Sequence, residues 1–155
     1  MTSVRMQILQ AVEAKLDLIR LELDWTKLVI NPREPIGEDE LNALIVLHGG
    51  DAEPLGLTGH VAESRVELSV GMMVLERGGE TAELLLDAGF VAISNALCDP
   101  QDIQLGGLAI GIDRLGISEP TIGRTAEGGR IMAGQAIDFA VRYLEREGDA
   151  ETPGP

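Results

Sequence analysis

The fold is decided by a stretch in which apolar residues alternate with others, Arg65-Val66-Glu67-Leu68-Ser69-Val70-Gly71-Met72-Met73-Val74. Successive side chains of a strand point to opposite faces of a sheet, so this period of two predicts a strand with one buried face. The extended pattern runs from His60 to Glu76 and ends in a turn at residues 77–80. A helix is then predicted from Thr81 to Leu97.

The apolar residues of this second helix are expected on one broad face, which we assign to Leu84, Leu85, Ala88, Val91, Ala92 and Ala96. A first helix is predicted from Ser3 to about Leu18, where apolar residues recur at spacings of three and four. Ser3 is its expected N-cap, because a serine hydroxyl accepts hydrogen bonds from the unpaired amide groups of a first turn.

The remaining segments complete an α+β pattern. Further strands are predicted at residues 43–47, 108–118 (with an irregularity at Gly116) and 135–145, and loops at 53–59 and 119–129. The segment 22–30 fits either a continued helix or a short strand, and its Trp25 is expected to pack in the core or an interface.

These elements predict one α+β domain over residues 1–147. Its sheet is expected to be mainly antiparallel and four-stranded, with two helices packed on one face. Residues 148–155 are acidic and end in Pro-Gly-Pro, so a disordered tail is expected there.

Composition limits the classes of partner. The 155 residues are 45% hydrophobic but only 3% aromatic, so the core must consist of Leu, Ile, Val, Ala and Met. Acidic residues outnumber Lys and Arg by 26 to 12, and the net charge of -14 repels phosphate groups. Binding to a nucleic-acid groove is therefore not expected. The acidity suits plain solubility, and it also suits a channel wall that does not grip DNA.

No targeting signal or membrane span is expected. The start of the chain lacks the apolar run of a signal peptide, and no segment approaches the roughly 20 apolar residues that a membrane span needs. Cys98 is the only cysteine, which excludes an internal disulfide and a zinc site built on cysteine pairs. It ends an apolar helical run, so a buried thiol is expected.

Few residues have the pattern of a catalytic or metal site. His48, Asp51 and His60 could form a site of two histidines and one carboxylate, although turn residues are the ordinary explanation. The run of residues 48–51, His-Gly-Gly-Asp, is like part of an esterase oxyanion loop, but no Gly-x-Ser-x-Gly elbow accompanies it. No helix follows the glycines of residues 106–111, so they offer phosphate no helix N-terminus. We expect no catalytic, cofactor or metal site.

Four residues are candidates for a contact with another subunit. Arg114, Arg124 and Arg130 are the cations that flank the predicted loop at 119–129, and Glu119 begins that loop. One use for them is pairing with acidic residues of a neighbouring subunit. The alternative is a solvated loop whose charges contribute little to stability. Both interpretations stay open.

Four stretches follow one another along the chain: the opening helix Met6-Gln7-Ile8-Leu9-Gln10-Ala11-Val12; the strand Ala43-Leu44-Ile45-Val46-Leu47 leading into Gly49-Gly50-Asp51-Ala52-Glu53; the long strand Glu63 to Leu75 with the helix Thr81 to Leu97; and the closing strand Ala136-Ile137-Asp138-Phe139-Ala140-Val141-Arg142-Tyr143-Leu144. In this order the sequence resembles the tail terminator proteins of long-tailed bacteriophages and related gene-transfer particles, also called minor tail protein U-like or tail completion proteins. The resemblance covers nearly the whole chain except the C-terminal tail.

The resemblance implies a structural protein of the virion tail that is not an enzyme and holds no cofactor. Such proteins form a six-membered ring that caps the tail tube when it reaches its set length and then offers a surface for head–tail joining. The implied partners are further copies of the chain, the tail tube protein and the head-side connector protein. DNA would pass through the lumen without specific binding, no membrane is involved, and assembly would take place in the host bacterial cytoplasm.

Two other functions stay open. Another tail or neck component, such as a tube subunit, would polymerise into filaments rather than closed rings. A small-molecule-binding protein or enzyme of α+β fold would need a deep pocket with convergent polar groups, for which the sequence offers His48, Asp51 and His60.

Overall fold

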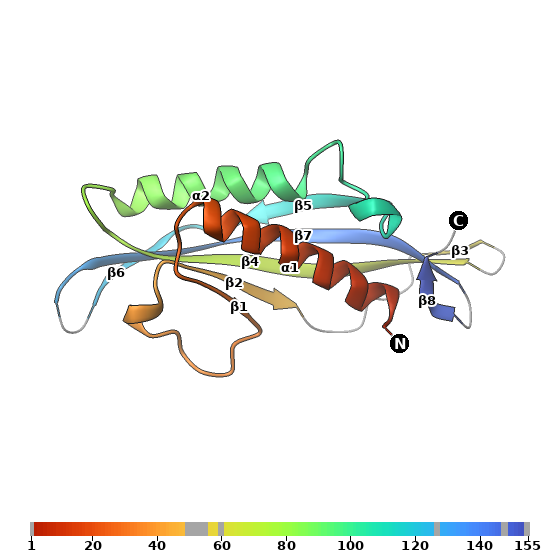
Figure 1. The fold of residues 1–155 in the computed structure, drawn as a ribbon, viewed down its shortest axis with the longest axis horizontal. Helices are drawn as coiled ribbons and strands as arrows, with labels where there is room; N and C mark the ends of the chain where they lie inside the picture. Colours follow the sequence, from red (N-terminus) through yellow and green to blue (C-terminus); the bar gives the residue numbers. More distant parts are fainter. Residues whose placement is uncertain (1, 49–55, 59–60, 126–127, 147–148, 154–155) are drawn as a thin grey trace.

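A computed structural model of the chain describes residues 2–48, 56–58, 61–125, 128–146 and 149–153. Two helices lie on one face of a long sheet (Figure 1). The elements are α1 (Val4–Glu22), β1 (Lys27–Ile30), a 3-10 turn (Glu38–Glu40), β2 (Ala43–His48), β3 (Gly56–Thr58), β4 (Val61–Leu75), α2 (Ala82–Leu97), a second 3-10 turn (Leu105–Gly107), β5 (Gly111–Ile117), β6 (Thr121–Arg124), β7 (Ile131–Arg146) and β8 (Asp149–Pro153).

The α+β class is confirmed, but the sheet is larger than the four antiparallel strands expected. Among the described residues it has eight strands in the order β1-β2-β4-β7-β5, with β3 on β4 and with β6 and β8 on β7. It is also mixed, because β1 runs parallel to β2 while the other pairs are antiparallel. The sequence missed these additions because each added strand is short, and short strands carry too few alternations to be recognised.

The pairing of β4 with β7 forms the centre of the sheet. Their register runs over fifteen residues, from Val61 opposite Arg146 to Leu75 opposite Met132. The alternation that opens the sequence analysis places one set of β4 side chains against the helices: Val66, Leu68, Val70, Met72 and Val74, each at most 3% exposed. Burying a side chain of this size contributes about 1.5–3 kcal/mol, so this one strand anchors much of the core.

Helix α1 begins as expected and continues further than expected. The Ser3 hydroxyl accepts a hydrogen bond from the Met6 amide at 3.1 Å. The helix runs four residues past Leu18 to Glu22, and Asp24 then takes a positive φ of 56° that reverses the chain. Residues 22–30, for which the sequence fitted either a helix or a strand, therefore contain both the end of α1 and the strand β1. Trp25 lies between them, only 3% exposed, which confirms its expected packing role.

The predicted buried face of α2 was right for Leu85, which is 1% exposed, and wrong for Leu84, Ala88 and Val91. Leu84 and Val91 are 62% and 47% exposed. Besides Leu85, the helix buries Ala82, Leu86, Gly89, Ile93 and Leu97, while Ala92 and Ala96 are half-buried. A helix that is apolar on several sides has a weak periodic signal, and close packing at Gly89 selects the face. A Cβ at Gly89 would lie 2.6 Å from Met72 Sδ and 2.8 Å from Trp25 Cη2.

Three predictions about the second half of the chain need revision. The expected loop at 119–129 contains β6, and β7 begins at Ile131, four residues before the expected start. The backbone of Asp149–Pro153 forms β8 along β7, where the sequence predicted a disordered tail. The irregularity expected at Gly116 is confirmed as a shift in register between Arg114 and Gly116. In the part of the chain described, neither helix is long and apolar enough to cross a membrane.

Cys98 caps the C-terminus of α2 and is half-buried, whereas a fully buried thiol was expected. Burial raises the pKa of its thiol, and the positive charge of Arg114 opposes that rise without cancelling it. Because the thiolate is the reactive form, alkylation by iodoacetamide should reach half its maximal rate at a higher pH in the folded protein than in urea. A lower midpoint in the folded protein would contradict this.

Replacing Gly89 by alanine should destabilise the protein. The added methyl gains about 1 kcal/mol in helix propensity, but the crowding against Met72 and Trp25 costs about 1–3 kcal/mol. We expect urea denaturation to give a free energy of unfolding lower by about 1 kcal/mol. Gly123→Ala is the control, because nothing lies within 4 Å of its added Cβ. Equal stability of Gly89→Ala and the wild type would refute the packing argument.

Candidate functional site

The candidate site is the edge of the sheet formed by β5 and β6. Both strands pair with the same side of β7, and between them the Ser118 amide donates to the Ala136 carbonyl at 2.8 Å. They therefore form one nearly continuous edge, seen beside β7 in Figure 1. Within the described residues no strand pairs with its outer side. Such an edge leaves backbone N–H and C=O groups available to another chain.

This edge also exposes large apolar side chains. Leu115, Ile117 and Ile122 are 52%, 47% and 56% exposed. Single exposed apolar residues are ordinary on a protein surface, but a row of them along an open strand edge is typical of an interaction site. Glu119 is the one charged residue between Leu115 and Ile122, so the exposed apolar side chains are separated by little charge.

The structure gives Arg114 a contact within its own chain. Its guanidinium lies 5.1 Å from the centre of the Phe90 ring on α2, and Nη1 is 3.4 Å from the Ser94 hydroxyl. A cation over an aromatic face is attracted by about 0.5–1 kcal/mol at an exposed site. Arg114 thus fastens β5 to α2, and Ser94 lies within that helix as the sequence indicated.

Arg124 at the end of β6 and Arg130 just before β7 each donate to a backbone carbonyl of their own chain. Arg124 Nη1 donates to the Gly129 carbonyl at 2.9 Å, and Arg130 Nη2 donates to the Glu76 carbonyl at 3.1 Å. Glu119 is exposed at the bend between β5 and β6. The structure spreads the four predicted residues out, with Arg114 on β5, Glu119 between β5 and β6, Arg124 at the end of β6 and Arg130 just before β7. Ten positions of extended chain from Arg114 to Arg124 span roughly 30 Å.

A groove between α2 and the strand edge was missed by the sequence analysis. It has a volume of about 270 Å³. Leu86 and Phe90 of α2 line it on one side, and Ile117 and Ile122 on the other. The sequence analysis missed the groove for two reasons. It left Leu86 out of the buried face of α2, and it placed Ile122 in a loop rather than in β6.

A second hollow, of about 430 Å³, includes parts of β2, β4, β5 and β7. Leu47, Glu67, Ser69 and Asp138 are among its lining residues, together with His48. The His48 ring lies 3.4 Å from the Asn31 side-chain amide, and the His48 backbone amide donates to Asn31 Oδ1 at 3.0 Å. His48 is the last residue of β2, and it therefore contacts Asn31, the residue that follows β1.

The proposed metal set is only partly described. Asp51 and His60 lie outside the described residues, so the site of two histidines and a carboxylate is not assembled here. Within the ranges that the structure covers, no three His, Cys, Asp or Glu side chains gather as metal ligands would.

No protein-family description matches the sequence, and no curated protein matches it. Among solved structures, the chain is similar to a chain of a structure described as the virion of a native gene transfer agent (GTA) particle. The two are 15% identical, with a TM-score of 0.49 over 84% of this chain and 90% of that chain. No family membership follows from this similarity.

Proposed function

We propose that this protein is a structural component of a virion tail. In this proposal it forms a ring that caps the tail tube, ends tail elongation and provides the surface for head–tail joining. The observation that carries the proposal is the open β5–β6 edge with its exposed Leu115, Ile117 and Ile122. An edge of this kind favours covering by another chain.

The two ends of the sheet favour a ring over a symmetric dimer. One end is the short parallel strand β1, and the other is the β5–β6 edge. These surfaces differ, so a contact between them is head-to-tail. A head-to-tail contact repeats around a circle and closes when its rotation allows. The family resemblance supplies the expected number, six.

The segments that carry the family resemblance occupy the framework of the fold. They fall on α1, on β2, on β4 with α2, and on β7, whose pairing organises the sheet. The partners proposed on this basis are further copies of the chain, the tail tube protein and the head-side connector. We further propose that the protein is not an enzyme and needs no cofactor. It would be assembled in the host bacterial cytoplasm.

The charge of the chain is compatible with DNA passing through the ring. At a net charge of -14, a lumen wall built from these subunits would repel DNA phosphates rather than bind them. This fits a channel through which DNA passes without specific contacts.

Two alternatives have a specific observation in their favour. A tube subunit would use the same two unlike edges, but its contact would not close and would give open filaments. A small-molecule-binding protein would use the hollow of about 430 Å³ beside Glu67 and Asp138, a volume within the usual range for ligand pockets.

Native mass and negative-stain microscopy at increasing protein concentration separate these functions. Closed rings of about six subunits support the terminator proposal. Open tubes favour a tube subunit. A monomer at every concentration, with a compound that raises the melting temperature, favours the binding protein.

Ile122→Lys should weaken self-association while leaving the fold intact. Ile122 is 56% exposed, so its replacement removes little core packing, but a lysine on an edge strand opposes the approach of another chain. We expect the apparent dissociation constant, measured by analytical ultracentrifugation, to rise about tenfold or more. Leu18→Lys on α1 is the matched control, because Leu18 is 63% exposed and lies away from this edge. Equal association of both variants would argue against the edge as an interface.

A further inference from the structure

Building on the proposed self-assembly, we propose the contact that joins neighbouring subunits. The groove between α2 and β6 receives Arg33 and its proline-flanked loop, residues 31–37, from a second copy of the chain. The inference depends on the proposed function only in assuming that copies assemble head-to-tail.

The groove has an apolar floor and an acidic rim. Leu86 and Phe90 on α2 and Ile122 on β6 form much of the floor. Glu83 and Asp87 of α2 stand on the rim, and both are exposed. This combination fits a segment with a short apolar part and a positive charge.

The rim carries uncompensated charge. Glu83 and Asp87 are one helical turn apart, and like charges at this spacing destabilise a helix. In the part of the chain described, neither carboxylate has an ion pair or a side-chain hydrogen bond. A cation brought by another chain would relieve this repulsion. The guanidinium of arginine suits the task, because its planar fork matches carboxylate oxygens.

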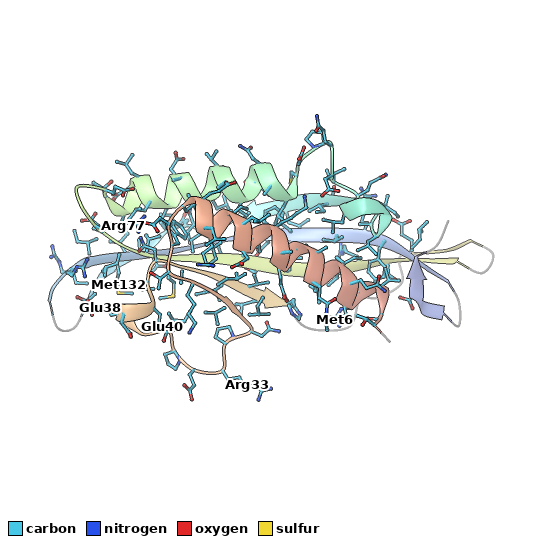
Figure 2. The ribbon with its side chains drawn as sticks, viewed as in Figure 1. Met6, Arg33, Glu38, Glu40, Arg77 and Met132 are labelled. Carbon is cyan, nitrogen blue, oxygen red and sulfur yellow. The ribbon has the colours of Figure 1, made fainter. Side chains whose placement is uncertain are left out.

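Arg33 has the complementary character. It is exposed, and among the cations whose side chains are described it has neither a hydrogen bond nor an ion pair. Figure 2 shows it projecting from the loop at the lower edge, away from the helices and the sheet. Pro32 and Pro35 restrict the loop, which lowers the entropy that it loses on docking. Ile36 adds an apolar side chain nearby.

Other cations are already engaged, which makes Arg33 distinctive. Lys15 pairs with Asp102 at 2.7 Å, Lys27 with Glu40 at 2.6 Å, and Arg142 with Asp113 at 2.8 Å. The pKa values of Asp102 and Glu40 are lowered, chiefly by hydrogen bonds from their lysine partners. These contacts bind the chain to itself and leave Arg33 to contact others.

The β1 edge and the β5–β6 edge lie at the same level, that is, at the same position along the direction of the strands. Following paired residues across the sheet leads from Ile30 on β1 through Val46, Val70 and Ile137 to Ile117. A second row leads from Lys27 through Ala43, Met73 and Gly134 to Thr121. A copy placed side by side would therefore bring β1 level with the bend between β5 and β6. The loop leaves β1 level with Ile117 and the chain enters β2 at Ala43, level with Thr121.

The bend explains why side chains rather than a continuous sheet should make this contact. Pro120 lies between β5 and β6 and has no N–H to donate, so strand pairing is interrupted there. Pro120 also lines the groove. A loop that places a charge on the rim and an apolar residue on the floor suits this site better than an added strand.

Charge reversal on each side tests the proposal. The first variant is Arg33→Glu, the second is Glu83→Arg with Asp87→Arg, and the third combines all three changes. Self-association is measured by analytical ultracentrifugation and negative-stain microscopy on the full chain, with thermal unfolding to verify folding. Arg65→Glu is the charge-matched control, because it makes the same charge change on an exposed residue of β4, away from the groove. Since this change also breaks the ion pair of Arg65 with Glu67 at 2.9 Å, thermal unfolding of the control is compared with that of Arg33→Glu.

We expect each of the first two variants to raise the apparent dissociation constant at least about tenfold, and the combined variant to recover most of the loss. If wild-type rings form and Arg33→Glu behaves like Arg65→Glu, the inference is overturned while the proposed function stands. Open filaments that Arg33→Glu disrupts would support this contact and contradict the capping ring. A wild type that is monomeric at every concentration contradicts both.

Discussion

The pairing of β4 with β7 is the constraint on which the rest of the structure depends. These are the two long strands, and every other strand except β1 pairs with one of them, while β1 pairs with β2 beside β4. Their shared register orients one face toward the helices, so that Val70 and Ile137 are buried opposite each other. A slip of one residue would exchange the buried and exposed faces. The helices, the edges and the groove are therefore all placed by one register.

From this arrangement follows an asymmetry between the two sides of the sheet. On the β1 side the edge is four residues long and leads into a restricted, exposed loop. On the other side β5 and β6 extend the edge beneath α2, whose face leaves a groove beside Ile122. Two unlike surfaces at the same level of one sheet favour repeated head-to-tail contact, and the geometry of that contact decides between a ring and a filament.

The sequence predicted the long elements well and the short ones poorly, for a physical reason. In β4 the alternation extends far enough that only one face can be buried, and the cap at Ser3 fixes the start of α1. β6 has four residues, all exposed, so no burial pattern marks it. The buried face of α2 depends on Gly89 admitting Trp25, a contact between distant segments that local periodicity does not contain. Arg114, Arg124 and Arg130 were named as candidates for a contact with another subunit, and the structure shows the side chains of all three in contact with their own chain.

Electrostatics decides what kind of contact such an acidic chain can make with itself. Two copies at -14 each repel at long range, but salt reduces this repulsion beyond about 10 Å at 0.1 M. Attraction at short range must then come from apolar burial and from the few cations that are not already paired. Because Lys15, Lys27 and Arg142 are used within the chain, a single projecting arginine can select which surface of the neighbour it meets. The acidic excess thus restricts the number of ways in which copies can associate, which favours one defined assembly over many.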